Sequence, residues 1–541
     1  MSRSVIVIGG GLGGLFTGAL LAKEGFAVSV FEKNDTIGGG LQTFSRKGFS
    51  FETGMHILGG LREGGSIYKI CRYLEVMDKI RVSDVDHDCI DSITYLSDGK
   101  TYRIPEGRDA FTEYLISEFP DEKDNIKAYV TALYDLTEEV DFFYLREGKD
   151  SLFSHSEQFL WPADEFIAHY VKNPKLRDLL AYMNPMYGGV KGHTPAYVHA
   201  LINVLYINGP SRFVGGSQQL ADALADIITE KGGNIYAGEG ISHIHVTDHM
   251  IDSVETTKGN RYHGDFYISA IHPCSLLRIT DNSAFPKSYR DRINGIQNTY
   301  SAFTLYIIFK ENMFPYINHT CYFQDDYGMV WDHGEYDASN WPRGFMYMTP
   351  NDVEQGRYAT KMIVNCIMNY ETVRQWENTT VGHRGKEYEK WKLSCSDMII
   401  NKLERLHPGF KYTIDTVYSS SPLTIRDYYN EKEGALYGVM KDCRNIVASQ
   451  IPVYTKVRNL YLTGQNINLH GFCGVPLTAI NTVEAIIGNN KLINKINLYI
   501  RSGRNCQVRL LSIFHLTDLS LLLPLYPTMW KYHLLMKMSK I

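Results

Sequence analysis

The sequence predicts an α/β fold in which a domain built on a parallel sheet is interleaved with a second, α+β domain. Two observations predict it. A buried strand, a glycine-rich turn, a helix and a second strand follow one another within residues 4–32, and glycine-marked units return near residues 213–236 and 459–464. At 541 residues the chain is also too long for one simple core. We therefore expect two interleaved domains and a terminal extension.

The first unit carries the glycine spacing of a Rossmann-like, dinucleotide-binding turn. Gly9, Gly11 and Gly14 fit G-x-G-x-x-G between the first strand and the helix. In this motif Gly9 permits the tight turn, Gly11 lets a pyrophosphate approach the backbone, and Gly14 lets helix and strand pack closely. The helix N-terminus offers its unpaired N–H groups to the phosphates. Glu32 ends the second strand and is expected to accept a hydrogen bond from a ribose hydroxyl. A purely structural glycine turn is the alternative.

Later elements follow from periodicity and glycine punctuation. Residues 218–231 predict an amphipathic helix, with Leu220, Leu224, Ile227 and Ile228 on one face. The other expected elements are strands at 241–246, 253–257, 265–270, 302–309, 361–368 and 459–462, and helices at 386–406 and from near Val475 to a C-cap at Gly488.

These units set the expected domain boundaries. The sheet domain is expected to be discontinuous, because residues 106–209, which lack the glycine punctuation of the first part, separate the first glycine-marked unit from the second. Its predicted parts are residues 1–105, 210–275 and 420–490. An α+β substrate domain is predicted over residues 106–209 and 276–419, followed by a basic, apolar C-terminal extension over residues 491–541.

The C-terminal extension differs in charge from the rest of the chain. Residues 491–541 hold eight Lys or Arg and one acid, Asp518. The apolar stretch 510–530 contains that acid, and its charge-free part of 12 residues is too short to span a bilayer. We expect the extension to lie on a membrane surface, which makes the protein peripheral. A helix docked on the protein's own core is the alternative.

Composition and missing motifs exclude several classes of function. Nine scattered cysteines without C-x-x-C pairs indicate reduced thiols in a cytoplasmic setting. The first strand begins near residue 4, leaving no room for a signal peptide. The net charge is −5 and no basic stripe appears, so a nucleic-acid partner is not expected. Hydrolase, kinase and zinc motifs do not appear, and no metal ligand is predicted.

Three segments together resemble a known family. They are the glycine turn with Glu32, residues 38–56 and residues 462–466. The chain resembles FAD-dependent oxidoreductases of the phytoene desaturase, carotenoid isomerase and retinol saturase group, within the wider amine-oxidase-like class, over roughly residues 4–490. Residues 51–56 are similar to F-[DE]-x-G-x-H, and residues 462–466 to L-T-G-Q-[DN]. Residues 214–216, 264–270 and 434–438 match the family as well.

The resemblance implies a Rossmann-like domain that binds FAD. In the family, a backbone amide and carbonyl at the position of Ile241 contact the adenine, and the helix start at Gly474 and Val475 faces the flavin ring. The residues implied to bind the cofactor are Gly9, Gly11, Gly13, Gly14, Glu32, Lys33, Gly38, Gly39, Gly40, Ile241, Gly464, Gln465, Gly474 and Val475. Two positions depart from the wider class: Gly40 replaces an arginine, and Gln465 replaces an aspartate.

The implied activity is hydride transfer at flavin N5 to or from a C=C bond of a hydrophobic polyene or isoprenoid substrate. Saturation needs a proton as well, so the candidate catalytic residues are His56, Tyr437 and His470, each with a structural role as its alternative. NAD(P)H, a quinone or no external partner at all remain open as the electron source.

Two other functions stay open at this point. One is an amine or protoporphyrinogen oxidase that passes electrons to oxygen. The other is a non-catalytic prenyl-lipid carrier, because Rab GDP-dissociation inhibitors resemble the same fold. The complete glycine turn with Glu32 and the segment around Gly464 favour a real cofactor over the carrier.

Overall fold

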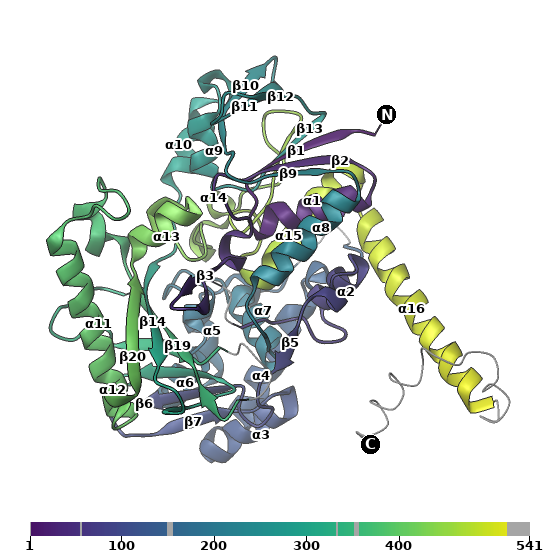
Figure 1. Cartoon of the computed structure of the whole chain (residues 1–541). Coiled ribbons are helices and arrows are strands. Elements are labelled where there is room, and N and C mark those ends of the chain that lie inside the picture. The colour runs from purple at the N-terminus through teal and green to yellow at the C-terminus, as the bar shows by residue number, and fades with distance from the viewer. Residues whose placement is uncertain (1, 55–56, 149–154, 332–333, 351–355, 517–541) are drawn as a thin grey trace, which may run out of the picture. The chain divides into compact units, whose positions relative to one another are not determined.

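The computed structural model describes residues 2–54, 57–148, 155–331, 334–350 and 356–516 (Figure 1). Its residues group into two units, 1–493 and 494–541, and each is considered by itself.

A five-stranded parallel sheet forms the centre of the first unit. Its strand order is β21-β13-β1-β2-β9. The strands are β1 (Ser4–Ile8), β2 (Ala27–Phe31), β9 (Asn234–Tyr236), β13 (Phe266–Ser269) and β21 (Leu460–Leu462). Strand β1 reads as an apolar run because four of its five residues are buried, as expected for a strand with neighbours on both sides. The predicted α/β fold is confirmed.

Three helices pack together against this sheet. Helix α1 contacts both α8 and α15, and Figure 1 shows the three running side by side although they come from distant parts of the chain. Their bounds are α1 (Leu12–Lys23), α8 (Gln218–Glu230) and α15 (Gly471–Ile487). Eleven of the twelve residues of α1 are buried, because α1 lies between its two neighbours.

A mixed seven-stranded sheet forms the second layer, in the order β20-β14-β19-β17-β16-β6-β7. Only the β16–β6 pair is parallel. The strands are β6 (Asp91–Tyr95), β7 (Thr101–Ile104), β14 (Ser301–Phe309), β16 (Thr320–Gln324), β17 (Gly344–Met348), β19 (Lys361–Met368) and β20 (Ile414–Ser420). All nine residues of β14 are buried, so both faces of this sheet are covered. Helix α11 (Lys386–Leu406) contributes to the core cluster that includes Phe303.

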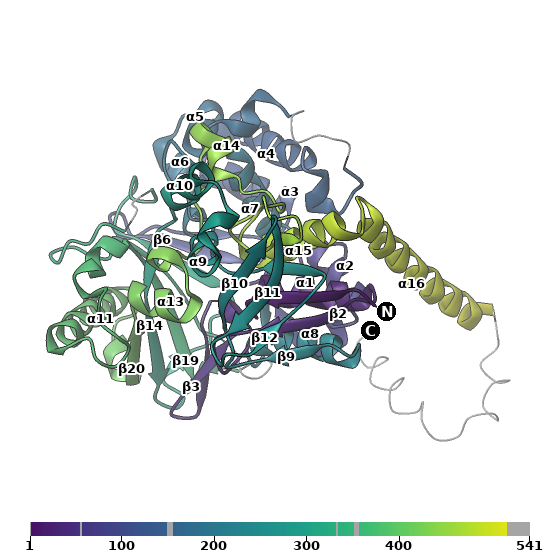
Figure 2. The same ribbon diagram turned by 90° about the horizontal axis from the view of Figure 1, so that it is seen from above.

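Smaller elements complete the first unit. A helical group comprises α3 (Arg108–Glu118), α4 (Lys123–Glu138), α5 (Ala163–Tyr170), α6 (Pro174–Leu180) and α7 (Ala196–Ile207). A three-stranded sheet comprises β10 (Ile241–Thr247), β11 (Met250–Thr256) and β12 (Arg261–Tyr262). Helices α9 (Pro273–Ile279) and α13 (Pro422–Tyr429) and the hairpin of β3 (Thr43–Arg46) and β4 (Phe49–Glu52) complete the elements used below. Figure 2 shows the three-stranded sheet and α9 from above.

Most expected element bounds agree with the structure, and one is wrong. Strand β19 and helix α11 have the expected bounds, and α8 ends one residue earlier. Helix α15 begins at Gly471, not near Val475. Pro476, a residue type favoured in a first helical turn, lies inside this helix instead. Its missing N–H costs one backbone hydrogen bond, which the burial around it offsets.

The second unit contains most of helix α16 (Lys491–Leu516), from Asn494 onward. Among the residues that the structure describes, no single helix is both long and apolar enough to cross a bilayer. Residues 517–541 lie outside the described part of the chain, and with them most of the apolar stretch 510–530. The membrane-surface role of the extension stays a prediction, and so do the domain boundaries.

Candidate functional site

The glycine turn between β1 and α1 is shaped by two different requirements. Gly9 has φ +103°, and a Cβ added at Gly14 would lie 1.9 Å from the carbonyl oxygen of Gly9. Both positions therefore need glycine for the fold itself. Gly11 has an ordinary φ of −80°, and an added Cβ there would meet nothing closer than Gly39 Cα at 3.8 Å. The turn itself does not demand a glycine at position 11, and that residue borders open space.

Two further chain segments close on this turn. Gly38 and Gly39 have φ of +118° and +56°, and the N–H of Gly38 donates to the carbonyl of Gly10 at 2.7 Å. On the other side, a Cβ added at Gly13 would lie 2.8 Å from Gly464 Cα. Residues far apart in sequence are thus packed backbone to backbone around the N-terminus of α1.

Glu32 is held by the turn that it faces. Its Oε2 accepts from the N–H of Gly10 at 2.8 Å, and its Oε1 accepts from the N–H of Asn34 at 2.9 Å. Only 7% of the residue is exposed. Each oxygen keeps a second lone pair, so the carboxylate can still accept from a ligand hydroxyl. The sequence had assigned Glu32 a ligand-binding role alone, whereas the structure shows that it also orders the turn.

A cavity of about 1070 Å³ opens beside these glycines. Eleven of the residues implied to bind the cofactor line it: Gly9, Gly11, Gly13, Glu32, Lys33, Gly39, Gly40, Ile241, Gly464, Gln465 and Val475. The other three lie behind its wall. Gly14 and Gly38 support the turn, and a Cβ added at Gly474 would meet Leu469 Cβ at 2.5 Å. Because α15 begins earlier than expected, Gly471 and Phe472 line the cavity in the place of Gly474.

The same cavity continues over the seven-stranded sheet. Its walls there are largely apolar and come from β3, β14, β17, β19, β20 and α13. The apolar and aromatic side chains among them are Phe44, Tyr306, Met346, Ile367, Val417, Tyr418 and Ile425. The cavity therefore has a glycine-lined end with Glu32 and an end suited to a hydrophobic molecule.

Tyr437 and His470 lie together at this site. Their ring centroids are 5.1 Å apart, and Tyr437 lines the cavity. Burial raises the pKa of the Tyr437 hydroxyl, so the phenol keeps its proton at neutral pH. Burial, together with the nearby Lys441 ammonium, lowers the pKa of His470 to about 3. Neither ring nitrogen of His470 has a hydrogen-bond partner among the described residues. His56 lies outside them, so its placement stays a prediction.

Sequence reasoning missed Glu431, which also lines the cavity. Burial raises the pKa of its carboxyl to about 7, although hydrogen bonds from Gln465 and Asn466 act in the opposite sense. Its Oε1 accepts from Asn466 Nδ2 at 3.4 Å. Its Oε2 has no hydrogen-bond partner among the described residues. The only signal in the sequence is its place just before residues 434–438, which the resemblance had singled out.

The arrangement suits a flavin dinucleotide. The open space at Gly11, with the start of α1 behind it, fits a pyrophosphate. Glu32 lines the same cavity with lone pairs left to accept from a hydroxyl, and the start of α15 turns its positive dipole end toward it. The three segments implied by the sequence thus meet on one cavity.

Comparison with known proteins shows which family the chain matches. Residues 12–379 match the family described as flavin containing amine oxidoreductase. All-trans-retinol 13,14-reductase of Macaca fascicularis is 25% identical, over 90% of this chain and 86% of that protein. Prolycopene isomerase 2 of an Oncidium hybrid cultivar is 24% identical, over 80% of this chain and 75% of that protein. The 4,4'-diaponeurosporene oxygenase of Staphylococcus aureus is 23% identical, over 89% of this chain and 97% of that protein.

Solved structures show the same fold. An oxidoreductase from Methanosarcina mazei superposes with a TM-score of 0.63 at 18% identity, over 89% of this chain and all of that one. Cyclohexylamine oxidase from Brevibacterium oxydans superposes with a TM-score of 0.59 at 13% identity, over 93% of this chain and all of that one. The resemblance predicted from the sequence is confirmed.

Proposed function

The chain belongs to the flavin-containing amine oxidoreductase family, and from that membership we propose that it binds FAD and acts on C=C bonds of a hydrophobic polyene or isoprenoid. The reaction is a saturation, a desaturation or an isomerisation. The observation that carries the proposal is the one cavity that joins the glycine-lined end to the apolar face of the seven-stranded sheet. Its relatives include a retinol reductase and a prolycopene isomerase, whose names specify polyene substrates.

FAD, when bound, supplies hydride transfer at its N5 atom. The residues that we propose to hold it are those lining the glycine end, with Glu32 on a ribose and Ile241 on the adenine. The start of α15 at Gly471 and Phe472 places unpaired backbone N–H groups at the cavity, where they stabilise negative charge. The segments 1–105, 210–275 and 420–490 form the cofactor domain in this proposal, and 106–209 with 276–419 form the substrate domain.

Two groups on the cavity wall hold protons at neutral pH. Tyr437 keeps its phenolic proton because burial raises its pKa, and burial raises the pKa of the Glu431 carboxyl to about 7, so that it binds a proton far more readily than an exposed glutamate. Each is a candidate to deliver or receive the proton that accompanies hydride transfer in a saturation. His470 is not among the residues that line the cavity and stays neutral, so we assign it the role of positioning the Tyr437 ring. The apolar walls exclude water from the reacting carbons.

We further propose NAD(P)H as the external electron donor for the saturating direction. It would bind only transiently, because the sequence carries one glycine fingerprint and not a second one for a tightly bound nucleotide. We also propose that residues 491–541 hold the protein on a membrane surface. Polyenes dissolve in bilayers, so the enzyme would take its substrate from the membrane.

One experiment separates the three reactions. The purified yellow protein is incubated without oxygen with a panel of polyenes, with and without NADPH, and the products are analysed by mass spectrometry. A gain of two hydrogens means saturation, a loss of two means desaturation, and an unchanged mass with a new retention time means isomerisation. A flavoprotein that leaves every polyene unchanged but is reduced by amines would contradict the proposal. A protein without flavin would contradict its cofactor part.

A further inference from the structure

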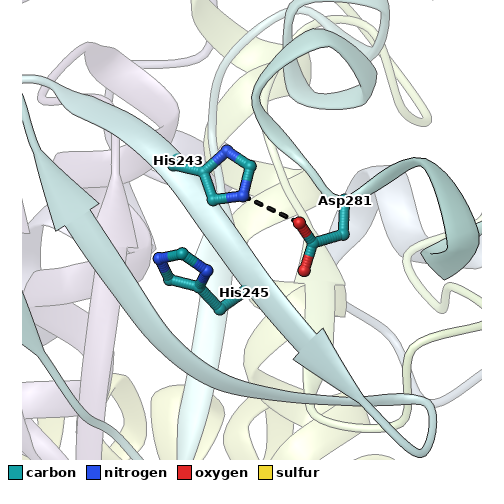
Figure 3. Close-up of side chains that lie close together, drawn as sticks. All are labelled: His243, His245 and Asp281. Atoms are coloured by element: carbon teal, nitrogen blue, oxygen red, sulfur yellow. Dashed lines mark hydrogen bonds and ion pairs between the residues drawn. The ribbon is translucent and has the colours of Figure 1, made fainter.

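The three-stranded sheet carries two histidines on one face of one strand. His243 and His245 are alternate residues of β10, so both project from the same side, while Ile244 between them is fully buried on the other. Their ring centroids lie 4.5 Å apart. Figure 3 shows both rings beside the carboxylate of Asp281, which follows α9.

Asp281 is fixed in place by the backbone of the same strand. Its Oδ2 accepts from the N–H of Val246 at 2.8 Å, and its own N–H donates to the carbonyl of Ile244 at 3.2 Å. Thr280 also forms an isolated bridge with Ile244. The carboxylate is therefore held beside the histidines by main-chain contacts that do not involve their rings.

We propose that His243, His245 and Asp281 form a binding site for a divalent transition-metal ion of the zinc class. One ligand atom from each residue lies within 4.8 Å of the others, and His243 Nε2 is 2.8 Å from Asp281 Oδ1. Two imidazoles and a carboxylate suit Zn²⁺, Co²⁺ or Ni²⁺ better than Ca²⁺ or Mg²⁺, which prefer oxygen ligands. All three residues are partly exposed, so water can complete the coordination.

Of the neighbouring charged side chains, one favours a cation at this site and one opposes it. Glu255 Oε2 lies 3.6 Å from His245 Nε2, and the negative charge of this carboxylate favours a cation at the site. Arg261 also reaches His245 Nε2, at 3.2 Å, and opposes a cation there. The same guanidinium lies 3.9 Å from Glu255, so it can turn to that carboxylate when metal binds.

The proposed ion would link two walls of the large cavity. Strand β10 begins at Ile241, and helix α9 ends at Ile279, two residues before Asp281. Both Ile241 and Ile279 line the cavity. Metal binding would therefore fasten the wall formed by β10 to the wall formed by α9. Sequence motifs did not reveal the site, because Asp281 is 38 residues from His243.

Calorimetric titration of the EDTA-treated full chain with Zn²⁺ tests the proposal. We expect one ion per chain, and a melting temperature that rises with Zn²⁺ because the ion binds the folded state. His245→Ala and Asp281→Asn should each weaken binding about tenfold or more, by comparison with the effects known for outer-shell residues. His249→Asn, in the nearby turn, is the matched control and should bind like the unsubstituted chain.

Three results would overturn it: no saturable Zn²⁺ binding, unchanged affinity in both ligand variants, or an equal loss in His249→Asn. Melting curves without metal check that each variant is folded. Should Asp281→Asn melt early, His245→Ala alone decides, because that side chain does not carry the backbone contacts of Asp281. The flavin content of each variant is recorded separately, so failure of the metal site and failure of the proposed redox function give different results.

Discussion

The carboxyl of Glu431 lies 4.0 Å from the Nε2 atom of His272 in the wall of the cofactor cavity. His272 Nδ1 accepts from the N–H of Cys274 at 3.1 Å, and its Nε2 pairs with Asn298 Oδ1 at 3.0 Å. Burial lowers the pKa of His272 to about 4, so the ring is neutral at physiological pH. Glu431 therefore faces a neutral ring and not a cation, which agrees with its raised pKa.

The first prediction is a pH-dependent stability carried by Glu431. Burial raises the pKa of the folded-state carboxyl to about 7, above its ordinary value of 4.5. The contribution of Glu431 to the free energy of unfolding is therefore complete below pH 4.5 and is lost as the pH rises through 7. The shift corresponds to about 3 kcal/mol. Glu431→Gln should lose less stability than the unsubstituted chain between pH 5.5 and 8, as measured by urea unfolding. Glu433→Gln, on the more exposed neighbour, is the control. Parallel curves for all three proteins would contradict the assignment.

Gly11→Val should fold normally but purify without flavin. The φ of Gly11 is available to any residue, and an added Cβ meets nothing closer than 3.8 Å, so the backbone of the turn accepts a side chain that points into the space proposed for the pyrophosphate. Gly14→Ala is the matched comparison, since its Cβ would lie 1.9 Å from the oxygen of Gly9 and should destabilise the fold itself. Absorbance near 450 nm and thermal melting of both variants separate the two effects. Full flavin content in a folded Gly11→Val protein would contradict the assignment of the pyrophosphate site to this turn.

Glu32→Gln should weaken FAD binding about ten- to a hundredfold. A hydrogen bond to a charged group contributes roughly 1.5–3 kcal/mol, and the amide nitrogen of Gln would also face one of the two backbone N–H donors, of Gly10 or Asn34. Titration of the apoprotein with FAD measures the loss. Asp35→Asn, an exposed neighbour, should leave the affinity unchanged. Equal affinities for all three proteins would place Glu32 outside the cofactor site.

Tyr437→Phe should retain flavin while slowing a saturating reaction by about 10²–10⁴, the usual contribution of a positioned acid. Phenylalanine keeps the ring contact with His470 and removes only the hydroxyl. Single-turnover oxidation of the reduced enzyme by a polyene measures the step directly. A variant that reacts at the original rate would leave Glu431 or His56 as the proton donor.

A chain ending at Ile493 should keep its flavin yet lose most binding to anionic liposomes. The structure moves the expected end point from residue 490, because the N–H groups of Leu492 and Ile493 both donate to Glu484 Oε1 at 3.0 Å. Basic residues near anionic lipid contribute about 1 kcal/mol each. Co-sedimentation at low and high salt compares the shortened and full chains. Full-length protein that stays in the supernatant at low salt would disprove the membrane role.

Local patterns were enough to predict the glycine turn and most element bounds. The spacing of Gly9, Gly11 and Gly14 encodes a turn directly, and the apolar periodicity of β19 and α11 extends over whole elements. Contacts between residues far apart in the sequence could not be predicted from such local patterns. Glu431 is defined by burial and by neighbours such as His272 that come from another part of the chain. The start of α15 at Gly471, four residues before the expected Val475, depends on tertiary packing that leaves no local pattern in the sequence.

The order of strands in the five-stranded sheet has a consequence for synthesis. Strand β1 is made first, but its neighbours in the sheet include β13, and β21 at the edge is made almost last. Gly464 and Val475, which line the cavity, leave the ribosome only after most of the chain has been translated. A chain that ends before Leu460 therefore lacks both the edge strand β21 and part of the cavity wall. The cavity wall is complete only after synthesis has passed Val475, so the site proposed for the flavin is assembled late.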